Sequence, residues 1–97
     1  MKTTQLREYT ITPGQLDTFA EVWSKGVRPL RKTMGFVIEG AWKVPSEGKF
    51  VWVVSYDGAA GWDAANKRYY DSPERKAMDP DPASFIIAQR TVFIDRV

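Results

Sequence analysis

The chain has 97 residues, a length that suits one domain with a single hydrophobic core. It contains no cysteine and no histidine, which excludes disulfides, thiolate nucleophiles, Cys-based zinc sites and catalysis by a Ser–His or Cys–His pair. A net charge of +2 is too small to indicate a polyelectrolyte partner. The longest apolar run, residues 50–56, is too short to span a bilayer, and no apolar leader opens the sequence, so we expect a cytoplasmic protein.

The first third of the chain predicts a strand followed by a long helix. Residues 4–11 are rich in strand-forming side chains, and Thr12-Pro13-Gly14-Gln15 predicts a helix start with Thr12 as N-cap and Gln15 completing a capping box. Gly26 and Pro29 predict a kink or break within the helix, and Gly35 predicts its end. The apolar residues that recur at helical spacing are Leu16, Phe19, Ala20, Trp23, Val27 and Leu30.

Two strands are predicted next. Residues 36–44 alternate in character, which predicts a strand with Ile38 and Trp42 on the same face. Residues 45–48 form a turn, and residues 50–56 follow as the most apolar segment of the chain. Because this segment is apolar on both faces, we expect it in the middle of a covered sheet.

The last third predicts a second helix and a final strand. Trp62, Ala65 and Tyr69 recur at helical spacing, Ser72-Pro73 predicts a further short helical turn, and residues 85–94 predict a strand. The order β-α-β-β-α-β predicts an α+β, ferredoxin-like split-βαβ fold. We therefore expect a single domain over residues 1–97, with a four-stranded antiparallel sheet and both helices on one face.

Such a sheet leaves one face without helices, although two of its strands are apolar on both sides. If Phe50, Trp52 and Tyr56 lay on that face, they would expose roughly 450 to 750 Å², more than a monomer usually leaves open. These three residues are therefore candidates for a homodimer interface through the sheet. If the helices cover them instead, the uncovered patch is the smaller one around Val51 and Val53.

The opening residues resemble the start of a NIPSNAP-type domain. Residues 6–14 read Leu-Arg-Glu-Tyr-Thr-Ile-Thr-Pro-Gly, and an aromatic residue and a tryptophan follow as Phe19 and Trp23. The later pattern is also similar over nearly the whole chain, whereas Gln5 stands where the family often has an acidic residue. The positions that carry this later similarity are Gly35, Gly40, Gly48, Tyr56 and Ser72-Pro73.

The resemblance implies the dimeric α+β barrel superfamily, in which two ferredoxin-like subunits pair their sheets. It therefore implies a homodimer with a ligand cleft between the sheet and the helices of each subunit. The superfamily includes cofactor-independent monooxygenases, isomerases and haem-degrading enzymes, and the haem-degrading members depend on a histidine that this chain lacks. We therefore expect a domain that binds a small aromatic or anionic molecule without a cofactor.

The candidate ligand residues are polar or aromatic side chains within otherwise apolar segments: Arg7, Tyr9, Trp62, Tyr69 and Arg90. An arginine in a cleft can hold a carboxylate, phenolate or enolate, with aromatic rings as walls. The alternative is structural: each arginine pairs with a carboxylate such as Glu8, Glu39 or Asp95, or extends to solvent. A cleft filled by side chains would then indicate a non-catalytic structural or protein-interaction dimer.

Three further patterns carry weaker alternatives. The RNA-recognition motif shares this strand order and stacks bases on strand aromatics, which here would be Tyr9, Phe50 and Trp52, but the third strand lacks its glycine-aromatic pattern and we expect no nucleic-acid partner. The acidic loop at residues 79–82 is typical of a turn, so we expect no metal site. Basic residues late in the first helix predict a solvated face: Lys25, Arg28, Arg31 and Lys32.

Overall fold

Four antiparallel strands form one sheet in the order β2-β3-β1-β4, and a computed structural model describes all residues, 1–97. The strands are β1 (Thr3–Ile11), β2 (Val37–Val44), β3 (Lys49–Tyr56) and β4 (Ile86–Ile94). The helices are α1 (Leu16–Val22), the π-helical η1 (Trp23–Val27), α2 (Arg28–Thr33), α3 (Trp62–Asp71) and α4 (Pro73–Lys76), with 3₁₀ turns η2 (Pro45–Glu47) and η3 (Pro82–Phe85).

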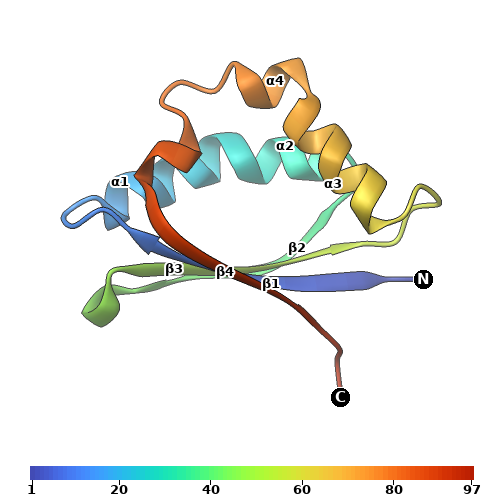
Figure 1. Ribbon diagram of the computed structural model, residues 1–97, viewed down its shortest axis with the longest axis horizontal. Coiled ribbons are helices and arrows are strands. Elements are labelled where there is room, and N and C mark those ends of the chain that lie inside the picture. Colours follow the sequence, from blue (N-terminus) through green and yellow to red (C-terminus); the bar gives the residue numbers. More distant parts are fainter.

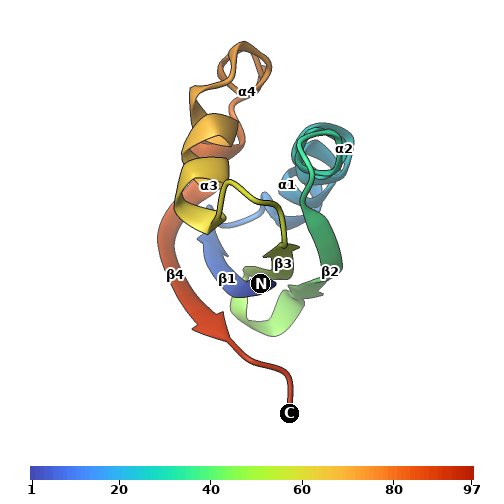
Figure 2. The same ribbon diagram turned by 90° about the vertical axis from the view of Figure 1, so that its right-hand side faces the viewer.

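All of the helices lie on one side of the sheet, as Figures 1 and 2 show. The segment α1–η1–α2 covers one part of that face, and α3 and α4 cover the part nearer β4. The order of the elements and of the strands confirms the expected ferredoxin-like α+β fold.

The aromatic face of β3 is turned towards the helices and forms the core. Phe50, Trp52 and Tyr56 are only 3%, 1% and 7% exposed. The rings that pack on them are, in the same order, those of Phe19, Trp23 and Phe36. These three β3 residues are therefore not available to a second copy of the chain, and their nomination as interface residues was wrong. The helices cover the larger rings because that choice removes more apolar surface from water.

The same arrangement contradicts the idea of an exposed base-stacking platform. Tyr9 lies beside Phe50 in the β1–β3 pairing, and both rings pack against Phe19 of α1. Bases stack on aromatic side chains of a sheet face that helices leave free. Here the helices occupy that face, so the RNA-recognition alternative loses its binding surface.

The face of the sheet away from the helices, called the open face below, carries scattered apolar side chains. The register of the strands shows which apolar residues lie on this face: Leu6, Val37, Trp42, Val51, Val53, Val92 and Ile94. Val37 and Trp42, both on the edge strand β2, are 53% and 55% exposed. The C-terminal end of the chain projects beyond the sheet on this same side (Figures 1 and 2).

A bulge in β2 changes which of its residues share a face. The pairing with β3 shifts between Ile38 and Gly40, so that Ile38 pairs with Val54 on the helix side and Gly40 pairs with Val53 on the open face. The predicted common face for Ile38 and Trp42 was therefore wrong. A Cβ atom on Gly40 would lie 2.4 Å from the Trp42 ring, so the indole lies directly over this glycine.

The first helix begins later than its sequence predicts. Residues 12–15 form a turn that contains Gly14 at φ 80°, and α1 begins at Leu16 with no side-chain cap. The Thr12 hydroxyl instead donates a hydrogen bond to the carbonyl of Phe85, at 3.1 Å. The predicted N-cap was wrong because a tertiary contact with the end of η3 captures that hydroxyl.

The expected disturbance around Gly26 and Pro29 takes the form of the π-helical segment η1. Pro29 has no N–H to donate, so the regular hydrogen-bond pattern cannot continue through it. The helical turn here contains one additional residue, and the N–H of Arg28 donates a hydrogen bond to the carbonyl of Trp23, five residues earlier. Trp23 and Val27, at the two ends of η1, are both buried. As predicted, the helical stretch ends before Gly35, which has φ 92°.

The second helical segment follows its sequence signals closely. Ser72 separates α3 from α4, and its hydroxyl accepts a hydrogen bond from the N–H of Arg75, at 3.1 Å, as an N-cap does. The same hydroxyl donates to the carbonyl of Tyr69, at 2.7 Å. This small residue fixes the angle between the two helices, and so directs side chains from both towards one place.

Candidate functional site

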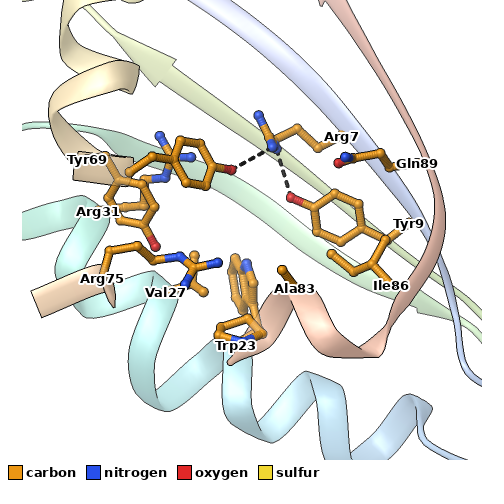
Figure 3. A pocket seen from close by; sticks show the side chains of 12 residues that line it. Arg7, Tyr9, Trp23, Val27, Arg31, Tyr69, Arg75, Ala83, Ile86 and Gln89 are labelled. Carbon is orange, nitrogen blue, oxygen red and sulfur yellow. Dashed lines mark hydrogen bonds between the residues drawn. The ribbon is translucent and has the colours of Figure 1, made fainter. Parts of the chain in front are cut away.

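A cavity of about 350 Å³ lies between the helices and the sheet. Seven elements contribute to its wall, and Figure 3 shows Arg7 and Tyr9 approaching from the sheet while Trp23 projects from the first helical segment. Its volume is at the lower end of the range that small-molecule sites occupy. The lining residues are Arg7, Tyr9, Trp23, Val27, Arg31, Tyr69, Tyr70, Arg75, Pro82, Ala83, Ile86 and Gln89.

Arg7 is a buried cation whose hydrogen bonds go only to neutral oxygen atoms. Its Nε donates to the hydroxyl of Tyr9 at 2.8 Å, and its Nη2 donates to the hydroxyl of Tyr70 at 2.8 Å. Its Nη1 donates to Oε1 of Gln5 at 2.7 Å. The side chain is 7% exposed and makes no salt bridge. Because a guanidinium has five N–H groups, two remain for another acceptor.

Arg31 is a second buried cation, and the sequence analysis placed it wrongly on a solvated face. It is 0% exposed, whereas Lys25 and Lys32 of the same basic cluster are exposed. Trp23, Val27 and Arg31 follow one another at intervals of four residues, so they share the buried face of the helical segment. That spacing was the signal that could have identified Arg31 among its basic neighbours.

The surroundings of Arg31 are aromatic and contain almost no hydrogen-bond acceptors. Its guanidinium carbon lies 3.8 Å from the ring centroid of Tyr69 and 4.6 Å from that of Phe36. Only Nη1 has a partner, Oδ1 of Asn66 at 2.9 Å, while Nε and Nη2 are buried without one. Cation–π contacts contribute about 0.5 to 2 kcal/mol each, whereas removing a charge from water costs several kcal/mol. The charge of Arg31 is therefore poorly compensated.

The pKa values of the two buried arginines shift in opposite directions. Burial lowers the pKa of Arg31 from its ordinary value, and repulsion from Arg7 acts in the same direction. Burial also acts to lower the pKa of Arg7, but Tyr9 and Tyr70 outweigh it and the net pKa is raised. An arginine does not lose its proton at neutral pH, so both groups remain cations.

A third arginine, Arg75 of α4, lies at the same cavity and differs from the first two. Its Nη1 is 3.0 Å from Oδ1 of Asp81, so its charge is paired. No acidic residue lines the cavity. Two cations, Arg7 and Arg31, therefore have no carboxylate to balance them.

Two other hydrogen-bonding groups of the cavity wall are buried without a partner. These are the hydroxyl of Tyr69 and Nε1 of Trp23. Burial raises the pKa of the Tyr69 phenol above its ordinary value, so it remains protonated and able to donate at neutral pH. An unpaired buried donor costs about 1 to 3 kcal/mol. All of the unpaired groups in this wall can thus donate to an acceptor that the chain does not supply.

The structure brings together three of the five ligand-site candidates and separates the other two. Arg7, Tyr9 and Tyr69 all line the cavity. Trp62 is buried and does not line the cavity; its ring centroid lies 5.7 Å from that of the core residue Phe36 and 5.8 Å from that of the exposed Phe93.

Arg90 lies on the other side of the sheet. It pairs with Glu8 across β1 and β4, on the open face, and is exposed. Its neighbour in the strand, Gln89, lines the cavity instead. Because successive side chains of a strand point to opposite faces, Arg90 cannot line the cavity if Gln89 does.

The structural alternative for Arg7 does not hold, because none of the proposed carboxylate partners pairs with it. Glu8 lies 3.4 Å from Lys49, and Glu39 lies 2.7 Å from Lys2. Asp95 makes no salt bridge. Among the lining residues that the sequence did not nominate are Arg31, Tyr70, Arg75 and Gln89.

No group of three or more His, Cys, Asp or Glu side chains is arranged to hold a metal ion. No helix combines the length and apolar character needed to cross a membrane.

Comparison with solved structures places this architecture among known folds. An uncharacterized NIPSNAP domain protein from Burkholderia xenovorans is 21% identical, with a TM-score of 0.83 over 100% of this chain and 95% of its own. A NIPSNAP family protein from Agrobacterium tumefaciens is 10% identical, with a TM-score of 0.84 over 99% and 86% of the two chains. A proposed antibiotic biosynthesis monooxygenase from Bacteroides thetaiotaomicron is 12% identical, with a TM-score of 0.76 over 99% and 90%.

The chain therefore has the ferredoxin-like α+β fold of NIPSNAP proteins, and the same fold occurs in monooxygenase-like structures. This confirms the resemblance noted in the opening residues at the level of the fold. No family model matches the sequence, and no curated protein matches it. Function must be argued from the cavity itself.

Proposed function

We propose that the protein is a homodimer in which each subunit binds a small anionic molecule with an aromatic or conjugated part. The observation that carries this proposal is Arg7, a buried guanidinium with neutral partners only, at the wall of an open cavity. A carboxylate, phenolate or enolate would accept from its two remaining N–H groups. The rings of Tyr9, Trp23 and Tyr69 suit a planar molecule beside that charge.

The same residues support chemistry on such a molecule. The Arg7 guanidinium can stabilise an oxyanion that develops on a bound enol or phenol. The hydroxyl of Tyr9, held 2.8 Å from Arg7 Nε, can orient the reacting oxygen or donate a proton to it. This pairing fits a cofactor-independent isomerisation, or an oxygenation in which molecular oxygen is the oxidant. In both, the protein supplies only charge, position and a proton.

The homodimer part of the proposal rests on the open face. Half-exposed apolar residues such as Val51, Val53 and Leu6 lie on the inner strands of this face, and no helix covers them. A second copy that applied its own open face would bury both sets in a two-fold interface. The competing model, a structural dimer with a filled cleft, is less well supported because the cleft is open and Arg7 has no carboxylate partner.

Native mass spectrometry of the protein as purified tests the proposal most directly, because a copurifying acid would appear as a fixed mass increment on each subunit. Titration calorimetry with benzoate, a planar carboxylate, then tests the role of Arg7. We expect Arg7→Met to weaken benzoate binding by about 10- to 100-fold, the value of a charge-assisted hydrogen-bond pair. Methionine keeps much of the packing of the arginine stem.

Arg90→Met is the matched control, because it removes the same charge from the other side of the sheet. It should leave benzoate affinity unchanged. Equal losses in both variants would mean that only the net charge matters. No binding of benzoate or of its ring-substituted carboxylates to a folded wild-type protein would refute the proposed function.

A further inference from the structure

We propose that the ligand of this cavity is a planar dianion, with one anionic group held by Arg7 and a second at the end of the cavity formed by Arg31 and Tyr69. This inference rests on the proposed function and specifies its ligand class. The sequence analysis assigned no ligand role to Arg31. The geometry assigns it one because its charge is buried in the cavity wall and lacks a counter-ion.

The charge balance of the cavity wall is the first argument. Three arginines line it and no aspartate or glutamate does. Asp81 pairs with Arg75, which leaves two cations, Arg7 and Arg31, without an anion. Buried charges are ordinarily paired, so this wall is short of two negative charges. A monoanion would compensate only one of them.

The positions of the unpaired donors are the second argument. Arg7 directs its hydrogen bonds to Gln5, Tyr9 and Tyr70. The unpaired donors of the wall are Nε1 of Trp23, Nε and Nη2 of Arg31 and the hydroxyl of Tyr69. The last two residues are in mutual contact, with the guanidinium carbon of Arg31 3.8 Å from the ring centroid of Tyr69. Acceptors are therefore missing at two places in the site, and a molecule with one carboxylate can serve only one of them.

The distance between the two cations suits a small molecule. The guanidinium carbons of Arg7 and Arg31 each lie 5.6 Å from the ring centroid of the same residue, Trp52. Both charges are thus arranged around one indole, within the reach of a single aromatic ring that bears two acidic groups. The aromatic side chains on several sides favour a flat molecule over a branched one.

The test compares matched probes in the wild-type protein. Benzoate carries one carboxylate, and phthalate, isophthalate and terephthalate each carry two at different spacings on the same ring. Titration calorimetry at neutral pH and low ionic strength should show at least one dicarboxylate binding about tenfold more tightly than benzoate. Because this comparison of the four probes uses only the wild-type protein, it does not depend on how well a core substitution folds.

Arg31→Met then assigns the second charge. We expect this variant to weaken dicarboxylate binding about tenfold more than benzoate binding, so that the preference for the dicarboxylate is lost. Lys32→Met is the matched control, since it removes an exposed charge from the next position of α2 and should keep the preference. A purely structural role for Arg31 would weaken both probes equally. If Arg31→Met does not fold, Tyr69→Phe replaces it and should reduce the preference through loss of one donor.

Each outcome bears on the inference. If benzoate binds but no dicarboxylate binds more tightly, the dianion is refuted and the proposed function stands. If the preference survives in Arg31→Met, or in Tyr69→Phe where that variant replaces it, the second subsite is refuted. If none of the four probes binds a folded wild-type protein, the proposed function fails and this inference fails with it.

Discussion

The two faces of the sheet differ in whether their charged side chains have partners of opposite charge. On the open face, Glu8 pairs with Lys49, and Glu39 pairs with Lys2 and accepts from the hydroxyl of Ser55. On the helix side, Arg7 and Arg31 have no carboxylate partner although both are buried. The open face thus leaves apolar surface uncovered while its carboxylates Glu8 and Glu39 are paired, whereas the cavity leaves two cations unpaired. The first pattern suits a protein partner, and the second suits an anionic ligand.

The largest expected effect concerns the open face. Val53→Glu would place a charge in the centre of the proposed interface, once in each subunit. Burial of an unpaired charge costs several kcal/mol, so we expect the dissociation constant of the dimer to rise at least about 1000-fold. Sedimentation equilibrium measures this change. Ala64→Glu, an exposed position on α3, adds the same charge elsewhere and should leave the dimer intact. A wild-type monomer at high micromolar concentration would contradict the homodimer.

A second prediction compares two large aromatic residues on opposite faces. Phe50→Ala removes a ring that packs on Phe19 and Trp23, and should lower the free energy of unfolding by about 3 to 5 kcal/mol. Trp42→Ala, on the open face, should cost less than about 1 kcal/mol when both are measured in the monomeric Val53→Glu background. Urea unfolding followed by circular dichroism gives both values. Equal losses would show that the two faces are not packed differently.

A smaller effect is expected at Tyr69. Its hydroxyl is buried without a partner, so Tyr69→Phe removes an unsatisfied polar group. We expect the ligand-free protein to become more stable, by about 1 kcal/mol, measured by urea unfolding. A loss of stability would mean that the hydroxyl already has a hydrogen-bond partner within the protein. It would then not be a free donor for the second anionic group of a ligand.

The smallest effect is a dependence on alkaline pH. Burial raises the pKa of Tyr69 in the folded protein above its unfolded value, so the folded state binds the proton more tightly. The corresponding stability is complete below the unfolded pKa and is lost as the pH rises through the folded pKa. The free energy of unfolding should therefore fall as the pH rises past about 10. The fall should be shallower in Tyr69→Phe, and identical slopes in the two proteins would contradict the assignment.

The comparison also shows how far sequence patterns reached in the candidate site. Arg7 and Tyr9 were predictable because β1 alternates simply, so residues two apart share a face. Arg90 was misplaced because the register of β4 depends on a shift opposite Thr10 and Ile11, which has no clear signature in the sequence. Arg31 was hidden among basic neighbours, and only its four-residue spacing from Val27 distinguished it.

The sequence by itself determined the order of the elements and several of their ends. Gly35 ends the first helical stretch and Ser72 caps α4, because both act through backbone contacts with near neighbours in the chain. Only the tertiary structure decided that the aromatic side of β3 faces the helices, that β2 changes faces at its bulge, and that two arginines meet around Trp52. Those choices depend on contacts between residues distant in sequence, and a local pattern fits either face of a sheet equally well.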